Sequence, residues 1–306
     1  MTKKLAITIG DPAGVGAEII KAWAEKNPQM HSLCEVIAHA GFLDLLPDSI
    51  GKREVGDKEY KATAGFPDSR GALIAFESLE AAASGCKSGR YFAVTTAPIS
   101  KAEMKKVGFN FAGQTEFFAD RWGGEPVMAF AGEHFLLSLA TWHEPLRRVP
   151  DSISADKIAR AVEAARILAV RVKKVKNPRI AVCGLNPHAG ENGILGLEEI
   201  DVINPILDSL RGDEKYCGLS AALPPDTVFE RAAKGEFDSI VSMYHDQGLA
   251  PLKAVDFDNA VNISMNLPFV RTSPDHGTGF GIAGKSIASA NSFECAVNLA
   301  LKLSGA

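Results

Sequence analysis

The sequence predicts an α/β fold with a mostly parallel sheet. Short apolar runs alternate along the chain with longer amphipathic segments, which is the pattern of strands separated by helices. Hydrophobic residues make up 46% of the 306 residues, enough to bury a sizeable core in one or two domains. We find no internal repeat and no Pro- or Ser-rich linker in the sequence, so two lobes would be joined through secondary structure rather than by a flexible tether.

Seven apolar runs predict strands, because each is short and bounded by turn-forming or polar residues. They are residues 4–9, 34–40, 91–97, 126–132, 135–141, 179–185 and 238–244. The fourth and fifth runs are close together around the triplet GEH, so they predict an antiparallel hairpin within the otherwise parallel pattern. Such a hairpin indicates a second lobe or a dimer contact.

Helices are predicted where apolar residues recur every three or four positions. These segments are residues 17–26, 69–84, 154–174, 198–211, 226–234 and 286–303. The segment 154–174 has the clearest pattern, because Ser154 is placed to cap its N-terminus and its last turn is basic.

Composition narrows the location and the partners. The net charge is −4 and no block of like charges occurs, which argues against nucleic acid and anionic membranes as partners. The five cysteines are scattered without a CxxC spacing, as expected for reduced thiols. No apolar run approaches the roughly 20 residues of a membrane-spanning helix. We therefore expect a cytoplasmic protein.

Glycine-rich and polar segments follow several predicted strands, where open α/β sheets bind their ligands. Residues 10–18, GDPAGVGAE, lie between a strand and a helix N-terminus. An anion held by backbone amides and a tight turn that requires glycine explain this segment equally well. Residues 95–101, TTAPISK, offer hydroxyl groups and a lysine, although an ordinary helix cap explains them too.

Three histidines, His143, His188 and His245, each fall just past an apolar strand. A single histidine is usually structural, and their spacing matches no local metal motif. Three strand-end imidazoles can nevertheless converge as a metal site that keeps a coordination position open for substrate. On spacing alone, both interpretations stay open. Arg271 follows a further apolar run, where it is suited either to clamp a phosphate or carboxylate or to form a surface ion pair.

Together these segments resemble one family, the 4-hydroxythreonine-4-phosphate dehydrogenases of pyridoxal phosphate (vitamin B6, pyridoxine) biosynthesis. The resemblance runs through ITIGDPAGVGAEI, TTAPISK, GQTEFFAD, LATWHEPLRRVP, GLNPHAGENG, PPDTVF, YHDQGLAPLK and VNISMNLPFVRTSPDHGTGFGIAG. Few of these segments are generic, so the set is far more specific than any single glycine loop.

The family implies a two-lobed α/β/α sandwich resembling isocitrate and isopropylmalate dehydrogenases. Its active site lies in the cleft between the lobes and is shared across a homodimer. By this resemblance we expect a discontinuous first lobe of residues 1–116 and 275–306. The second lobe, residues 117–274, would carry most metal and substrate residues.

The resemblance also implies roles for residues at the matching positions. A divalent metal (zinc, magnesium or cobalt) would be held by His143, His188 and His245. The phosphorylated substrate would be contacted by Gln114, Thr115, Lys253, Asn262 and Arg271. Residues 276–285 resemble the adenosine-binding loop HGSAPDIAGK of isocitrate-type enzymes, so NAD or NADP is expected at His276, Gly277, Thr278 and Lys285. Gly279 and Gly281 depart from that loop pattern.

The family reaction oxidises 4-phosphooxy-L-threonine (4-hydroxythreonine 4-phosphate) to 2-amino-3-oxo-4-phosphooxybutanoate, which decarboxylates to 3-amino-2-oxopropyl phosphate. Asp246 is one candidate for the group that takes the hydroxyl proton, with orientation of His245 as its alternative role. Lys253, expected on the same loop as His245, is the rival candidate for the proton acceptor.

One substitution opens an alternative within the same chemistry. Gln114 stands where the family usually has a histidine in the motif GHTE, and a glutamine cannot carry a proton. A paralogous dehydrogenase of a 4-phosphorylated sugar acid, erythronate or threonate 4-phosphate, is therefore the second hypothesis. A third, from another class, is an acyl or phosphoryl transferase on a related α/β scaffold, which would have no need for three histidine ligands.

Overall fold

The computed structural model describes residues 3–305, which fall into two compact units. Unit 1 holds the described residues up to Pro126 together with those from Leu267 onward, and unit 2 is Val127–Asn266. The expected lobe boundaries, at residues 116/117 and 274/275, fall instead inside a helix and at the end of a strand of unit 1.

Unit 1 contains a parallel sheet in the strand order β3-β2-β1-β4-β11. Its strands are β1 (Lys4–Thr8), β2 (Cys34–Ala38), β3 (Gly51–Glu54), β4 (Tyr91–Thr96) and β11 (Val270–Pro274). Its helices are α1 (Gly16–Lys26), α2 (Ala40–Leu43), α3 (Ser69–Lys87), α4 (Lys101–Lys106), α5 (Gln114–Trp122) and α11 (Asn291–Ser304).

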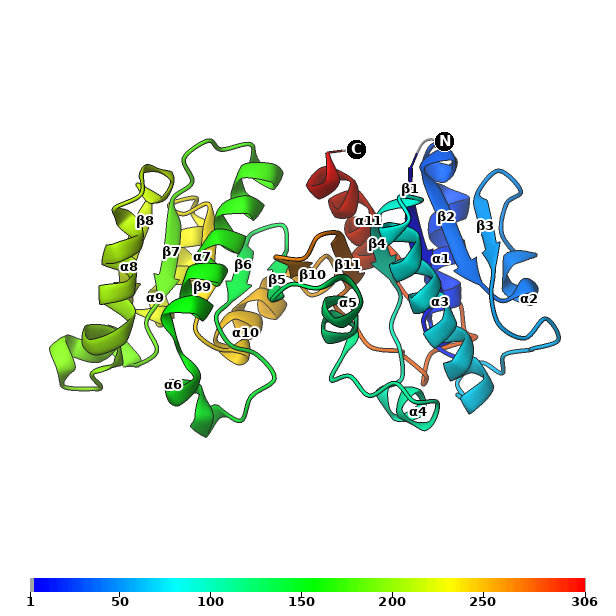
Figure 1. The fold of residues 1–306 in the computed structure, drawn as a ribbon, viewed down its shortest axis with the longest axis horizontal. Coiled ribbons are helices and arrows are strands. Elements are labelled where there is room, and N and C mark those ends of the chain that lie inside the picture. Colours follow the sequence, from blue (N-terminus) through cyan, green and yellow to red (C-terminus); the bar gives the residue numbers. More distant parts are fainter. Residues whose placement is uncertain (1–2, 306) are drawn as a thin grey trace. The chain divides into compact units, whose positions relative to one another are not determined.

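Two hydrophobic clusters cover the opposite faces of this sheet. Leu5 and Ile7 of β1 pack in one cluster with Trp23 of α1 and Phe293 of α11. The intervening Ala6 belongs to the other cluster, which α3 and α5 complete. Because successive strand residues point to opposite faces, this division shows helices on both sides of the sheet, as Figure 1 also shows.

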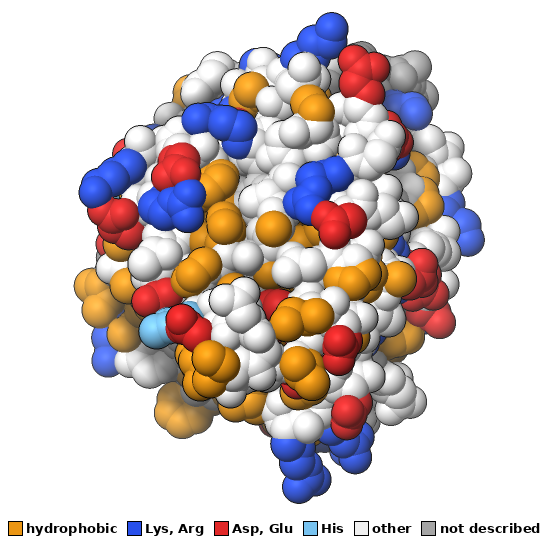
Figure 2. All heavy atoms as spheres, turned by 90° about the vertical axis from the view of Figure 1, so that its left-hand side faces the viewer, with side chains coloured by type: hydrophobic (Ala, Val, Ile, Leu, Met, Phe, Trp, Pro, Cys, Tyr) orange, Lys and Arg blue, Asp and Glu red, His pale blue; other side chains and the backbone are white. Residues whose placement is uncertain are grey.

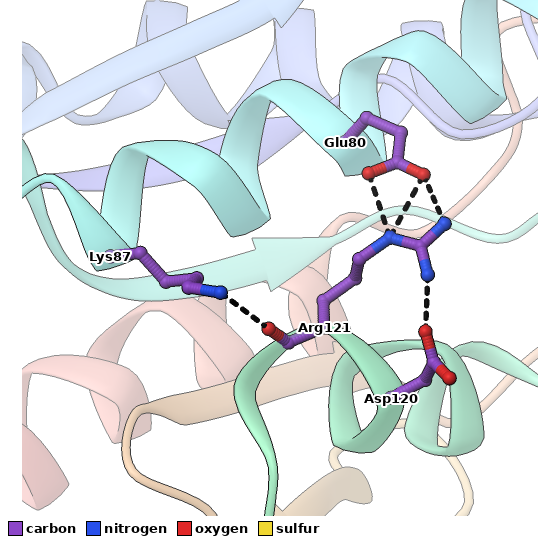
Figure 3. A network of polar contacts seen from close by, with 4 residues as sticks. All are labelled: Glu80, Lys87, Asp120 and Arg121. Carbon is purple, nitrogen blue, oxygen red and sulfur yellow. Dashed lines mark hydrogen bonds and ion pairs between the residues drawn. The ribbon is translucent and has the colours of Figure 1, made fainter.

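Helix α5 is tied to unit 1 by its aromatic side chains and by Arg121. Phe117 and Phe118 are fully buried in the second cluster. The Arg121 guanidinium donates to the Glu80 carboxylate of α3 and contacts the neighbouring Asp120, while Lys87 Nζ donates to the Arg121 carbonyl at 3.2 Å (Figure 3). These contacts explain why the boundary of unit 1 lies beyond α5, and they fix the helix whose first residue is Gln114.

Unit 2 contains a mixed sheet in the strand order β10-β5-β6-β9-β7-β8. Its strands are β5 (Val127–Ala131), β6 (Leu136–Leu139), β7 (Ile180–Cys183), β8 (Leu219–Leu223), β9 (Ser239–Ser242) and β10 (Val261–Met265). Its helices are α6 (Val149–Ser152), α7 (Ala155–Leu168), α8 (Asn204–Arg211), α9 (Pro225–Ala233) and α10 (His245–Asp256). Strands β5 and β6 form the predicted antiparallel hairpin, and β6, β9, β7 and β8 are mutually parallel.

The sheet of unit 2 is also covered on both faces. Leu137 of β6 packs with Val228 of α9 and Leu249 of α10, whereas the next residue, Ser138, donates from Oγ to the Ala161 carbonyl of α7 at 2.8 Å. The predicted α/β class is therefore confirmed in both units. The predicted cap is confirmed as well, because Ser154 Oγ accepts the backbone N–H of Lys157.

Several elements were not expected. Strands β3, β8, β10 and β11 and helices α4 and α5 contain many polar or small residues, so they lack a clear apolar period. The segment after β9 was expected to be a loop that carries both His245 and Lys253, and this prediction is wrong because it forms helix α10. Gly248 and Pro251 are typical of loops, yet the missing Cβ of Gly248 lets the helix approach the Leu137 side chain.

None of the described helices is long and apolar enough to span a membrane.

Candidate active site

Three parallel strands of unit 2 bring the expected metal ligands to one edge. His143 follows β6, His245 follows β9 and His188 follows β7, and β9 lies between the other two strands. Because β6, β9 and β7 run parallel, their carboxyl ends lie at the same edge of the sheet. The sequence alone did not give this strand order.

Side chains and backbone join these three strand ends through Met243. The Met243 carbonyl accepts the backbone N–H of Thr141 at 3.1 Å and its hydroxyl at 2.7 Å. On the other side, the Met243 N–H donates to Gln247 Oε1 at 2.7 Å, and Gln247 Nε2 donates to the Gly184 carbonyl at 2.6 Å. Thr141 and Gln247 therefore fix the spacing of the three segments that carry the histidines.

Two of the three histidines occupy left-handed backbone. His143 and His188 both have φ near 53°, and positive φ continues from His188 through Gly193. Left-handed conformations cost free energy for residues other than glycine and persist only where the surrounding structure holds them. Strain at two candidate ligands therefore favours a functional role for these turns.

The imidazoles of His143 and His245 lie beside each other, with ring centroids 5.9 Å apart and ring planes inclined by 35°. His245 Nδ1 lies 2.7 Å from Asp246 Oδ1, and His188 Nδ1 lies 2.6 Å from Glu191 Oε2. Because an ionised carboxylate only accepts hydrogen bonds, a neutral imidazole in this geometry carries its proton on Nδ1. The lone pair then sits on Nε2, the arrangement in which a carboxylate orients a metal-binding histidine.

Within the described residues, the candidate metal ligands form a pair rather than a group of three. Within residues 3–305, no three His, Cys, Asp or Glu side chains come together as a group that could hold a metal ion. Imidazole nitrogens are common ligands of divalent metals, and His143 and His245 lie close enough together to form a pair of such ligands. A third ligand has to join that pair.

A cavity of about 560 Å³ opens at the same edge of unit 2. Its lining includes His188, Asp246 and Tyr244, with apolar walls from Phe229 and Pro251. His188 therefore faces the same space as the carboxylate next to His245. The other predicted substrate residues of this unit are half-buried: Lys253 on α10 and Asn262 on β10.

In unit 1, Arg271 of β11 is buried opposite Val94 of the neighbouring strand β4. Only 4% of the residue is exposed, and its Nε and Nη2 donate to Thr96 Oγ1 at 3.1 and 2.7 Å. Burial lowers the pKa of Arg271 to about 10, so the guanidinium stays charged at neutral pH. A buried cation of this kind is suited to a phosphate or carboxylate.

Gln114 and Thr115 form the first turn of α5. Gln114 Nε2 donates to the Ala97 carbonyl at 3.2 Å, while its Oε1 is buried without a hydrogen-bond partner in the structure. Thr115 is 3% exposed. A ligand that donates a hydrogen bond would satisfy the Gln114 oxygen.

The glycines of the GDPAGVG segment are required by close backbone contacts. A Cβ at Gly10 would lie 2.3 Å from the Pro98 carbonyl oxygen, one at Gly14 2.7 Å from that of Thr278, and one at Gly16 2.5 Å from that of Ile9. The tight-turn interpretation accounts for all three glycines.

The expected cofactor loop, residues 276–285, packs against this turn and α1. Val15 N–H donates to the Thr278 carbonyl at 2.9 Å, and the Glu18 carboxylate accepts the backbone N–H groups of Gly284 and Ser286. Lys285 Nζ donates back to the Gly281 carbonyl within the loop. His276 Nδ1 lies 2.9 Å from the Gly277 carbonyl oxygen, and its Nε2 is buried without a hydrogen-bond partner.

Comparison with known proteins decides the family. The family model of the pyridoxal phosphate biosynthetic protein PdxA matches residues 13–300. The 4-hydroxythreonine-4-phosphate dehydrogenase of Xanthomonas oryzae pv. oryzae is 37% identical over 324 residues, which cover 99% of each chain. This chain belongs to the PdxA family.

Solved structures agree with that membership. The crystal structure of the 4-hydroxythreonine-4-phosphate dehydrogenase from Klebsiella pneumoniae matches with a TM-score of 0.85 at 30% identity, covering 99% of this chain and all of that one. Isocitrate dehydrogenase from Methylococcus capsulatus matches with a TM-score of 0.54 at 13% identity, a likeness of fold alone. The expected family, its dehydrogenase class and the resemblance to isocitrate dehydrogenases are thereby confirmed.

Within this PdxA chain, the sequence did not reveal the residues that hold the site together. Thr141, Gln247, Glu191 and Thr96 act on backbone groups or on other side chains. The partners of Thr141, Gln247 and Thr96 are backbone groups or residues far away in sequence, so no local pattern marks these contacts; Glu191 contacts His188, three positions earlier. Only the strand order, once known, points to them.

Proposed function

We propose that this protein is a metal-dependent 4-hydroxythreonine-4-phosphate dehydrogenase that uses NAD or NADP. It would convert 4-phosphooxy-L-threonine to 2-amino-3-oxo-4-phosphooxybutanoate, which loses CO2 to give 3-amino-2-oxopropyl phosphate. The observation that carries the proposal is the pairing of His143 with His245 at joined strand ends, in a chain of the PdxA family.

His143, His188 and His245 would hold the divalent ion, for which zinc, cobalt and magnesium are the candidates. When bound, the ion would polarise the substrate oxygens and stabilise the negative charge that develops on them. Asp246 and Glu191 keep the rings of His245 and His188 oriented through Nδ1. That role for Asp246 leaves Lys253 as the residue that takes the hydroxyl proton.

Charge and hydrogen bonding support the assignment of the substrate contacts. Arg271, held by Thr96, would bind the phosphate, with Lys253, Asn262 and Thr115 as further contacts. Gln114 Oε1 would accept a hydrogen bond from the substrate. His276, Gly277, Thr278 and Lys285 would contact the adenosine part of the cofactor.

We further propose a cytoplasmic homodimer in which residues of both copies serve each active site. The incomplete ligand group within the described part of one chain supports this assembly, because a second copy can supply the third ligand. Free thiols support the location, since no disulfide links the five cysteines.

The alternative substrate is a 4-phosphorylated sugar acid, erythronate or threonate 4-phosphate. Gln114 favours it, because glutamine cannot replace the proton-carrying function of the usual histidine at that position. The test is NADH or NADPH formation by the purified protein with each substrate after loading with zinc, cobalt or magnesium. Formation with 4-phosphooxy-L-threonine supports the proposal, whereas turnover of the sugar acids alone would replace it with the alternative.

A further inference from the structure

The turn that carries His188 is unusual, because all five residues from 188 to 192 have positive φ. The angles are 53°, 52°, 83°, 45° and 56°, and only the third residue is glycine. A run of left-handed residues does not hold itself, since each side chain crowds the following carbonyl oxygen. Something outside the turn has to hold it.

Glu199 is the buried group that meets this need. Only 1% of the residue is exposed, although glutamate is rarely buried. Its Oε1 accepts the backbone N–H groups of Leu185 at 2.7 Å and Asn186 at 2.8 Å, and its Oε2 accepts Asn186 Nδ2 at 2.9 Å. One carboxylate thus fixes the two residues through which the chain enters the turn.

The turn also closes tightly around this carboxylate. A Cβ at Gly184 would lie 2.9 Å from Glu199 Oε1, and a Cβ at Gly190 would lie 2.8 Å from Oε2. Gly190 lies within the left-handed run, so the carboxylate touches the turn as well as its entrance. A buried acceptor with several N–H donors is strongly held, and it cannot be removed without leaving those donors unpaired.

We propose that Glu199 is a positioning residue, whose buried carboxylate holds residues 188–192 in the left-handed turn that presents the His188 imidazole to a divalent metal. This inference rests on the proposed function. Glu191 sets the orientation of the ring, and Glu199 sets the backbone beneath it.

The turn leads into a surface segment with exposed Ile194, Leu195 and Leu197. The face of unit 2 in Figure 2 shows hydrophobic side chains among acidic ones, with a histidine exposed beside them.

The test measures metal binding directly. Zinc affinity is obtained by competition with a chromophoric chelator, and the visible spectrum of the cobalt-loaded protein reports the ligand geometry. Glu199→Ala is expected to weaken zinc binding about 10- to 100-fold and to change the cobalt spectrum. Glu199→Gln keeps an oxygen for the two backbone amides, so it is expected to lose less.

Glu198→Gln is the matched control. Glu198 also accepts from Asn186 Nδ2, at 2.7 Å, but its carboxylate lies against Gly196, beyond the left-handed turn. We therefore expect zinc affinity within about threefold of the parent, well below the change expected at Glu199. If Glu199→Ala does not fold, Glu199→Gln is measured instead, and its melting temperature shows whether it is folded. Zinc affinity and a cobalt spectrum equal to those of the parent in folded Glu199→Gln would overturn the proposal.

A second background separates this inference from the proposed function. In His188→Ala, Glu199→Gln is expected to leave the residual metal affinity unchanged, because the ligand through which it acts is gone. An equal loss in both backgrounds would mean a purely structural role and would overturn the inference. If His188→Ala itself binds zinc like the parent, the proposed metal site fails instead.

Discussion

At the carboxyl ends of the unit 1 strands, backbone segments lock one another in place, whereas in unit 2 side chains hold the strand ends together. In unit 1, Gly10, Gly14 and Gly16 allow carbonyl groups of neighbouring loops to approach within van der Waals contact. In unit 2, Thr141 and Gln247 bridge three strands, and two of the three candidate ligands, His143 and His188, have left-handed backbone.

The difference teaches what each edge can do. Unit 1 combines this interlocked backbone with the buried cation Arg271. A buried cation on a fixed backbone suits an anionic group of the substrate. In unit 2, strained turns carry His143 and His188, and carboxylates orient the rings of His188 and His245. This arrangement suits a metal and a reaction at its open position. Substitutions in unit 2 should therefore affect chemistry, and substitutions in unit 1 should affect binding and stability.

Removing a proposed metal ligand of unit 2 should have the largest effect. His188→Ala is expected to lower kcat by about 1,000-fold or more and to reduce bound zinc, because the ion loses one imidazole. Its side chain is mostly exposed, so the melting temperature should change little. Metal analysis and steady-state kinetics on the same preparation check both expectations.

His134→Ala is the histidine control for that variant. His134 lies in the hairpin turn and pairs with Asp256, away from the three strand ends. Zinc content and kcat should match those of the parent. If His188→Ala were as active as the parent, the strand ends of unit 2 would not carry the chemistry, and the contrast with unit 1 would fail.

Arg271→Lys tests the buried cation of unit 1. Lysine keeps the charge but lacks the planar fork that donates to two oxygens, so kcat/KM is expected to fall about 100-fold, mainly through KM. Arg70→Lys is the control, because Arg70 is exposed and pairs with Asp57 at the surface. A change confined to kcat would place Arg271 in the chemistry rather than in phosphate binding.

The sequence predicts much of this arrangement, for reasons that particular residues make clear. The apolar runs before His143, His188 and His245 are buried strands, as their composition indicates. Their convergence could not be predicted from spacing, because it depends on β9 lying between β6 and β7.

Other features escaped prediction because distant contacts decide them. Helix α10 forms in spite of Gly248 and Pro251, since Leu249 and Leu252 are buried against the sheet. The hydroxyl group of Thr96 is visible in the sequence, but nothing there indicates that it accepts hydrogen bonds from Arg271. Where the partner is backbone or a remote side chain, only the folded structure reveals the role.

Gly14→Ala is expected to have a smaller effect, on stability. Its new Cβ would lie 2.7 Å from the Thr278 carbonyl oxygen, a backbone atom that cannot move without its loop. Overpacking of this kind costs about 1–3 kcal/mol in the free energy of unfolding. Gly281→Ala, in the neighbouring loop, has no atom within 4 Å of its new Cβ and should leave stability nearly unchanged. Denaturant unfolding of both variants checks the difference, and equal stability would contradict the interlocked backbone.

The smallest expected effect is a pH dependence in unit 2, outside the candidate site. Asp256 raises the pKa of His134 above its ordinary 6.5, first through the 2.7 Å hydrogen bond to Nδ1 and then through its charge. Because the folded pKa is raised, the stabilisation is fully present below pH 6.5 and is lost as the pH rises through the folded value. His134→Ala should therefore lower the melting temperature more in acid than in mildly alkaline buffer. The backbone N–H of residue 134, which also donates to Asp256, remains in the variant, so the comparison isolates the imidazole. An equal loss at both pH values would show that packing of the ring, and not its charge, stabilises the hairpin turn.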